Sequence, residues 1–163
     1  MKSSFAPIAD ANTRVLILGS LPGEASLQRA QYYANPRNQF WRLVGRVIDA
    51  DLVDHAYEER LAILQDHGVG LWDVVRDAER VGSLDADIRN QTANALVALA
   101  ATLPKLRVLA FNGGKAFAVG RKQFAEESPL RLIALPSSSP AHTAPFEGKA
   151  AAWAQLREFI AAT

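Results

Sequence analysis

The stretch Arg14-Val15-Leu16-Ile17-Leu18-Gly19 decides the fold, because it is a short, continuous apolar run that ends at a glycine. A run of this length without polar alternation predicts a strand that is buried on both faces. Such strands belong to parallel sheets whose two faces are covered by helices. We therefore expect helices to alternate with further strands along the chain.

The remaining sequence does alternate between helical and strand patterns. The patterns predict helices over 40–48, 57–66, 96–103 and 115–125, a C-terminal helix marked by Trp153, Leu156 and Ile160, and strands over 69–75, 107–112 and 130–135. Polar sequence over 76–91 predicts an irregular surface connection. Together these elements predict an α/β fold, a three-layer α/β/α sandwich around a four-stranded parallel sheet, formed by one domain over residues 1–163.

The composition excludes several classes of site. The chain has no cysteine and 3 histidines, so disulfides, iron–sulfur clusters and thiolate zinc sites are excluded, and no metal is expected. A net charge of +1 gives no bulk attraction to a polyanion, so any contact with nucleic acid must come from locally placed cations and backbone N–H groups. No run is apolar enough to suggest a signal peptide or a membrane span, and we expect a cytoplasmic protein.

Three polar segments lie at or near the ends of expected elements. They are Gly19-Ser20-Leu21-Pro22-Gly23, Gln31-Tyr32-Tyr33-Ala34-Asn35-Pro36-Arg37-Asn38-Gln39-Phe40-Trp41, and Leu135-Pro136-Ser137-Ser138-Ser139-Pro140-Ala141-His142. The second crowds aromatic rings, amides, a proline and a guanidinium ahead of a helix, which is typical of a recognition pocket. Ligands of open α/β sheets bind beyond the carboxyl ends of the strands. We therefore expect these segments to meet around one cleft.

These segments resemble the motifs of the uracil-DNA glycosylase superfamily, most closely those of its hypoxanthine-DNA glycosylase branch. The resemblance covers nearly the whole chain in order. It implies a base-excision repair enzyme that hydrolyses the N-glycosidic bond of a deaminated base in DNA, above all hypoxanthine, after the nucleotide has rotated out of the stack. We expect a monomer that needs no cofactor and whose partner is DNA containing the deaminated base.

Asn38 is the expected catalytic residue. In the hypoxanthine branch the catalytic role belongs to the Asn of a Pro-Arg-Asn sequence, which is Pro36-Arg37-Asn38 here. An amide suffices because the dissociating bond leaves an electron-poor sugar that reacts with a positioned water molecule. The alternative from the residues alone is that Asn38 caps the following helix, and the two roles are compatible.

The expected base-binding residues are Tyr33, Leu21, Asn112 and His142. Tyr33 stands where the mismatch-specific branch stacks an aromatic ring on the flipped base, although core packing is the ordinary alternative. Leu21 stands where other branches carry a catalytic Asn or Asp, so the usual catalyst of the first motif is absent. The Asn112 amide could read a base edge, and His142 could hydrogen-bond the base or be an ordinary surface histidine.

The expected DNA contacts are made mostly by short side chains. Hydroxyl and backbone N–H donors can approach phosphates without a large positive charge. The residues expected to contact DNA are Ser137, Ser138, Ser139, Arg37 and Lys115. Asp73, late in an expected strand, is a reserve candidate for orienting water, with a turn or helix cap as its alternative. No lysine is placed as an amine nucleophile, which favours a monofunctional glycosylase without strand cleavage.

Three other functions stay open from the sequence. The first is a uracil or mismatch-specific glycosylase of the same fold. The second is a noncatalytic module that binds nucleotides or DNA, because Leu21 replaces a superfamily catalyst. The third is a serine hydrolase that uses Ser139 and His142; it is the least favoured, because the chain lacks the G-x-S-x-G nucleophile elbow.

Overall fold

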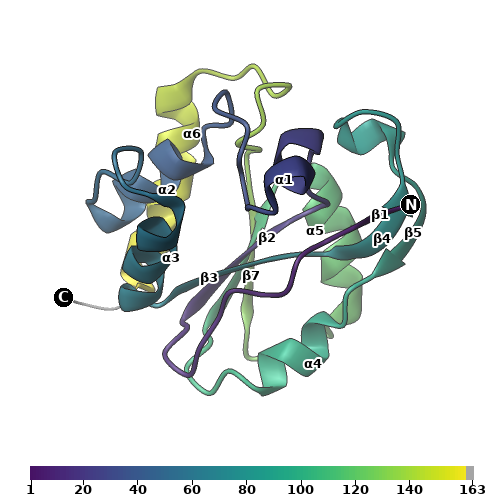
Figure 1. Cartoon of the computed structure of the whole chain (residues 1–163). Coiled ribbons are helices and arrows are strands. Elements are labelled where there is room, and N and C mark those ends of the chain that lie inside the picture. Colours follow the sequence, from purple (N-terminus) through teal and green to yellow (C-terminus); the bar gives the residue numbers. More distant parts are fainter. Residues whose placement is uncertain (161–163) are drawn as a thin grey trace.

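The computed structural model describes residues 1–160 and contains two sheets, of which the larger is fully parallel (Figure 1). Its strands lie in the order β3-β2-β6-β7. They are β2 (Val15–Gly19), β3 (Val69–Asp73), β6 (Val108–Asn112) and β7 (Arg131–Leu135). The predicted four-stranded parallel sheet and its helical layers are therefore confirmed. The apolar run that begins at Val15 forms a central strand.

Helices cover both faces of this sheet (Figure 1). On one face lie α2, α3 and α6, and on the other lie α4 and α5. The helices are α1 (Glu24–Arg29), α2 (Phe40–Ile48), α3 (Tyr57–Asp66), α4 (Leu96–Ala101), α5 (Gly114–Gly120) and α6 (Phe146–Trp153), with shorter 3₁₀ turns over Asp85–Asp87, Arg121–Gln123 and Ala154–Glu158. No helix in the described range 1–160 is long and apolar enough to cross a membrane.

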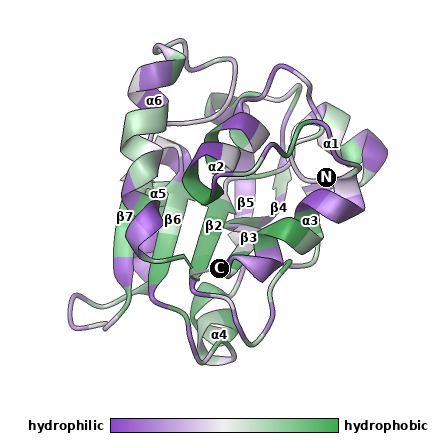
Figure 2. Ribbon diagram, turned by 90° about the vertical axis from the view of Figure 1, so that its left-hand side faces the viewer, coloured by the Kyte–Doolittle hydropathy of each residue, from purple (hydrophilic) through white to green (hydrophobic). Residues whose placement is uncertain are grey.

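Alternation along the strands divides the core into two clusters. Successive side chains of a strand point to opposite faces, so Val15 and Ile17 pack under α2 and α6 while Leu16 and Leu18 pack under α4 and α5. The central strands β2 and β6 are hydrophobic along most of their length, as Figure 2 shows. Burial on both faces is the physical reason why β2 carries no polar alternation.

A second, antiparallel sheet replaces the irregular connection that the sequence predicted for residues 76–91. It contains β1 (Lys2–Ser3), β4 (Val75–Glu79) and β5 (Arg89–Ala93) in the order β1-β4-β5. The prediction was wrong because every residue of β5 is exposed, so the strand is polar and lacks an apolar pattern. The strand predicted over 69–75 in fact divides between β3 of one sheet and the first residue of β4 of the other.

One further helix and several helix ends also differ from the prediction; α4, for example, ends at Ala101 and not at 103. The helix α1, which follows the Gly19–Gly23 turn, carries no long apolar stripe and was not predicted. The helix α5 ends at Gly120 and continues only as a 3₁₀ turn, so the predicted helix over 115–125 was too long. The C-terminal helix α6 spans Phe146–Trp153, so only Trp153 of the residues that marked it belongs to the helix. Leu156 lies in the 3₁₀ turn that follows, and Ile160 lies beyond that turn.

Candidate active site

A cavity of about 460 Å³ opens at the carboxyl edge of the parallel sheet. A volume of this size suits a small-molecule ring system. The three polar segments of the sequence all contribute to its lining, as expected. Its walls are formed by residues 19–26, by Tyr32, Tyr33, Asn35 and Asn38, by Asp73, by residues 83–86, by Asn112, and by residues 137–142.

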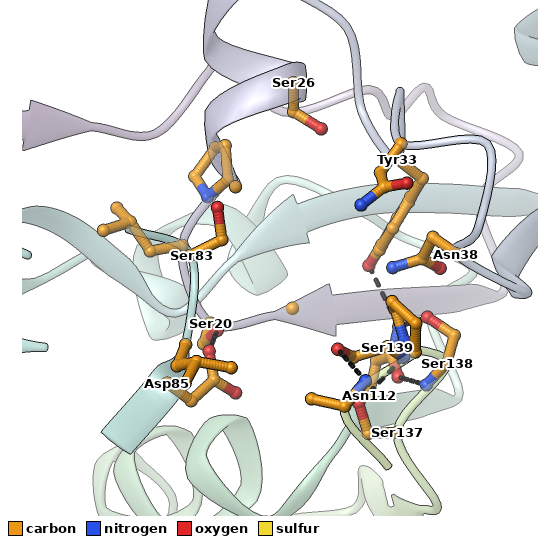
Figure 3. A pocket seen from close by; sticks show the side chains of 18 of the residues that line it. Ser20, Ser26, Tyr33, Asn38, Ser83, Asp85, Asn112, Ser137, Ser138 and Ser139 are labelled. Carbon is orange, nitrogen blue, oxygen red and sulfur yellow. Dashed lines mark hydrogen bonds between the residues drawn. The ribbon is translucent and has the colours of Figure 1, made fainter. Parts of the chain in front are cut away.

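Asn38 lies at the entrance to α2 and lines the cavity (Figure 3). Its Oδ1 accepts a hydrogen bond from the backbone N–H of Phe40, the first residue of α2, at 2.9 Å. The N-cap residue itself is Gln39, so Asn38 satisfies this N–H group from one position earlier than the expected cap. This bond also fixes the orientation of the amide, since an N–H donor must face the oxygen. The amide nitrogen therefore points into the cavity, toward the Tyr33 hydroxyl (Figure 3). The bond to Phe40 and a role at the cavity are compatible, because the bond uses one lone pair of Oδ1 and does not use the amide nitrogen.

The Tyr33 ring is held in a fixed plane beside the cavity. Phe40 stacks on it with ring centroids 3.8 Å apart and an interplanar angle of 6°. The Trp41 indole N–H donates to the Tyr33 carbonyl at 3.0 Å, and the backbone of Tyr33 has a φ of 54°, in the left-handed region that non-glycine residues rarely adopt. Since Phe40 covers one face of the ring, the opposite face is the one available to a stacked base.

Tyr32, in contrast, belongs to the core. Its side chain is buried, and its hydroxyl donates to the carbonyl of Ala6 at 2.7 Å. Of the two uses expected for an aromatic ring in this segment, core packing applies to Tyr32, and Tyr33 is the ring that reaches the cavity. Tyr32 packs, and Tyr33 is partly exposed at the cavity.

Asn112 joins the third strand end to the serine loop. Its Nδ2 donates to Ser138 Oγ at 2.9 Å and to the Tyr33 hydroxyl at 3.3 Å, and its Oδ1 accepts from the Ser138 backbone N–H at 2.9 Å. Asn112 and Ser138 are both buried. These bonds fix the Tyr33 hydroxyl and the loop in one arrangement, so Asn112 organises the wall against which a base edge would lie.

The turn after β2 is held by the second sheet. Ser20 Oγ donates to Asp85 Oδ1 at 2.5 Å (Figure 3), and the buried Arg80 guanidinium donates to the carbonyls of Pro22 and, at 2.9 Å, of Gly82. Leu21 lies in the cavity wall with its side chain packed into the core. The turn is thus fixed by contacts that do not depend on the residue type at position 21.

Asp73 ends β3 and reaches the cavity from its floor. Only 4% of the residue is exposed, and its Oδ2 has no hydrogen-bond partner among residues 1–160. Burial and, to a lesser extent, the Asp85 charge raise the pKa of this carboxyl, Arg80 opposes the shift, and the resulting pKa is about 7. Gly19, paired with Asp73 in the register of β2 and β3, leaves room for it: a Cβ there would lie 2.6 Å from Asp73 Oδ1 and 3.0 Å from the Tyr33 hydroxyl.

The other residues expected at the site divide into two groups. Ser137, Ser139 and the exposed His142 line the cavity, with Ser138 buried beneath them. Arg37 and Lys115 do not line it; Arg37 is exposed before α2, and Lys115 is partly exposed in α5. A role for these two cations on the DNA backbone stays a prediction.

Lys149 supports the site and was missed in the sequence. It is 1% exposed in α6, and its Nζ donates to Gln39 Oε1 at 2.9 Å, to the His142 carbonyl at 2.6 Å and to the Ser139 carbonyl at 3.5 Å. Burial lowers its pKa. One signal could have found it: Lys149 follows Phe146 by three residues and precedes Trp153 by four, so it lies on the apolar stripe of its helix.

Lys149→Met should loosen the serine loop. The thioether matches the length of the lysine stem but leaves three oxygen acceptors without their donor, so we expect the free energy of unfolding to fall by about 1–3 kcal/mol. Urea denaturation of both proteins measures the change. Lys122→Met, at an exposed position, is the matched control and should change the stability by less than about 0.5 kcal/mol. Equal stability of the two variants would show that Lys149 does not anchor the loop.

One wall of the cavity was not indicated by any sequence pattern. It is formed by Ser83, Leu84, Asp85 and Ala86. These residues lie between β4 and β5, and Ser83 Oγ accepts from the backbone N–H of Glu24 at 2.9 Å. The side chains of this wall face Asn38 and Tyr33 across the cavity (Figure 3). Their position depends on the pairing of β4 with β5, which the sequence did not reveal.

Comparison with known families identifies the class. The model of the uracil DNA glycosylase superfamily matches residues 6–157 of this chain. The chain therefore belongs to the uracil DNA glycosylase superfamily, and it is an enzyme that hydrolyses N-glycosyl bonds in DNA. DNA as its partner follows from this class.

Two curated relatives come from methanogenic archaea, and both are named hypoxanthine DNA glycosylase. The protein from Methanosarcina acetivorans is 47% identical over 116 residues, covering 71% of this chain and 73% of the relative. The protein from Methanosarcina barkeri is 37% identical over 159 residues, covering 94% and 96%. The resemblance to the hypoxanthine branch is therefore confirmed.

A solved structure shares the fold. The solution NMR structure of a putative uracil DNA glycosylase from Methanosarcina acetivorans superposes with a TM-score of 0.86 at 39% identity, covering 97% of this chain and 98% of that one.

Proposed function

We propose that this enzyme releases hypoxanthine from deoxyinosine in DNA, with Asn38 as the catalytic residue and Tyr33 as the stacking platform. The observation that carries the proposal is that the amide nitrogen of Asn38 and the ring of Tyr33 line one cavity (Figure 3). The names of the two curated relatives support the choice of hypoxanthine.

Asn38 would act by positioning water. Its Nδ2 can donate to the water oxygen, and the second lone pair of Oδ1 can accept one water proton while the first accepts the Phe40 N–H. The departing base leaves an electron-poor sugar, so a held water molecule needs little activation. No cofactor enters this step. Among the described residues that line the cavity there is no lysine, which supports a monofunctional reaction without a Schiff base.

The flipped base would lie on the free face of Tyr33. Stacking of a base on an aromatic ring contributes about 1–3 kcal/mol and tolerates different bases. Extrusion costs a few kcal/mol and is least for a mispaired base, so weak pairing of hypoxanthine supplies part of the selectivity. The serine loop 137–139, with Arg37 and Lys115 outside the cavity, would contact the DNA backbone. Action as a single-domain monomer in the cytoplasm also stays part of this proposal.

An assay of several lesions in parallel tests the proposed substrate. Oligonucleotides with one deoxyinosine, deoxyuridine or deoxyxanthosine, each single-stranded and paired, are incubated with excess enzyme and then cleaved with alkali at abasic sites. We expect the largest single-turnover rate for deoxyinosine. Faster release of uracil would decide for a uracil-specific enzyme, and tight binding of deoxyinosine DNA without any release would decide for a noncatalytic module.

A further inference from the structure

The side chain of Asp73 is a buried acid that faces the cavity without a partner. Its residue is 4% exposed, it lines the cavity, and its Oδ2 has no hydrogen-bond partner among the described residues. A buried polar atom without a partner costs about 1–3 kcal/mol, so its retention beside a ligand cavity calls for a ligand that satisfies it.

The groups around Asp73 leave it uncharged over a wide range of pH. The titratable and charged groups facing it are Tyr33, Tyr32, Asp85 and Arg80. Asp85 opposes ionisation, and the hydrogen bonds of Arg80 go to the Pro22 and Gly82 carbonyls. With its pKa raised to about 7 by burial, Asp73 carries a proton below neutrality and can donate it.

The position of the carboxyl is fixed relative to the stacking ring. A Cβ at Gly19 would contact both Asp73 Oδ1, at 2.6 Å, and the Tyr33 hydroxyl, at 3.0 Å, so both side chains converge on the same point of the cavity floor. The Tyr33 hydroxyl is already held by Asn112. A base that lies on Tyr33 would therefore present its edge to Asp73.

We propose that Asp73 is the general acid of the reaction and donates its proton to a ring nitrogen, N7 or N3, of the departing hypoxanthine. This inference rests on the proposed function and assigns the leaving-group side of the same reaction. Asn38 and Asp73 then have separate tasks, the first at the attacking water and the second at the purine.

The reaction is a hydrolysis in which Asp73 supplies a proton and later regains one. The C1′–N9 bond breaks and its electron pair moves into the purine, while the Asp73 proton bonds to the ring nitrogen, so the purine leaves as a neutral tautomer. Water forms the new C1′–O bond and loses one proton to solvent. Asp73 then regains a proton, and no oxidant, reductant or cofactor is consumed.

The proton donor also explains a preference for purines. Hypoxanthine carries ring nitrogens with free lone pairs, N7 and N3, that can accept a proton as the glycosidic bond breaks. The ring nitrogens of uracil are N1, which carries the sugar, and N3, which carries a hydrogen, so neither offers a lone pair to the acid. General acids of this kind contribute about 100- to 10,000-fold to a rate.

The first test is the pH dependence of single-turnover release of hypoxanthine by the wild-type enzyme. We expect the rate to fall about tenfold per pH unit above the pKa of Asp73, near 7. Asp73→Asn should lower the rate at pH 6 by about 100-fold and abolish this decrease in rate with pH. The dissociation constant for deoxyinosine DNA should change less than about threefold. His142→Asn, which replaces the histidine that lines the cavity, should keep this decrease in rate.

The second test identifies the proton acceptor. Oligonucleotides with 7-deaza- or 3-deaza-2′-deoxyinosine replace one ring nitrogen by carbon, and the comparison is the ratio of wild-type to Asp73→Asn rates on each. We expect the ratio of about 100 to fall near 1 on one analogue and to persist on the other. The ratio does not depend on the different intrinsic lability of the analogues.

The outcomes separate the inference from the proposed function. If the wild type releases hypoxanthine but Asp73→Asn stays within about threefold of it, or if the ratio is the same on all three substrates, Asp73 is not the acid and the proposed function stands. If the wild type releases uracil and no hypoxanthine, both fail. Thermal denaturation of Asp73→Asn shows whether the variant is folded, and the wild-type pH profile decides without it: a rate that is flat from pH 6 to 9 overturns the inference.

Discussion

Asn38→Ala should lower the single-turnover rate of hypoxanthine release by about 100- to 1000-fold, because it removes the only side chain proposed to hold the attacking water. The expected loss in stability is much smaller. Removing the hydrogen bond to the Phe40 N–H costs about 1 kcal/mol, since the α2 terminus loses its cap. Excision of deoxyinosine in a paired oligonucleotide and urea denaturation measure the two effects.

Asn38→Ser separates the cap from the chemistry. A serine hydroxyl can still accept the Phe40 N–H, but it lacks the amide that reaches the cavity. We expect this variant to be nearly as stable as the wild type and nearly as inactive as Asn38→Ala. A folded Asn38→Ala enzyme with normal excision would refute the catalytic role.

Asp73→Asn should remove a large part of the pH dependence of stability. The folded state holds the Asp73 proton up to about pH 7, whereas the unfolded chain releases it near 3.8. The protonated carboxyl thus favours the folded state fully below pH 3.8, and this contribution is lost as the pH rises through 7. The difference corresponds to about 4 kcal/mol. Between pH 4 and 8 the variant should therefore gain up to that amount relative to the wild type.

Urea denaturation at half-unit steps of pH measures this difference. Asp66→Asn, at an exposed position in α3, is the matched control and should follow the wild-type curve. Comparison at each pH removes the contributions of the other carboxylates, which are present in all three proteins. If Asp73→Asn and the wild type run parallel from pH 4 to 8, the carboxyl is ionised in the folded protein and cannot be a proton donor at neutrality.

The parallel sheet was predictable because its central strands β2 and β6 are buried on both faces. The run from Val15 to Gly19 has no polar residue, and the strand ends at Asp73 and Asn112 place polar side chains at one edge. The positions of Asn38 and Tyr33 at the cavity could likewise be expected from the motif that carries them. Short-range patterns sufficed for these features, because each depends on burial or on a helix terminus within a few residues.

The supports of the site could not be predicted in the same way. The wall at Ser83 and Asp85 exists only because β4 pairs with the wholly exposed β5, and pairing of a polar strand leaves no periodic trace. The oxygen acceptors of Lys149 lie 110, 10 and 7 residues away from it along the chain, at Gln39, Ser139 and His142. The two roles considered for Asn38 could be named from the sequence, but only the structure shows that its Oδ1 accepts the Phe40 N–H.

The wall of residues 83–86 can change in sequence and length without disturbing the parallel sheet. It lies in the β4–β5 connection, outside the parallel sheet that carries Asn112 and Asp73. Insertions or exchanges in such a surface connection leave the sheet unchanged. Because this connection forms one wall of the cavity, a change in its length would change the width of the cavity. The size of the accepted base can therefore change in evolution while Asn38 and Asp73 keep their positions.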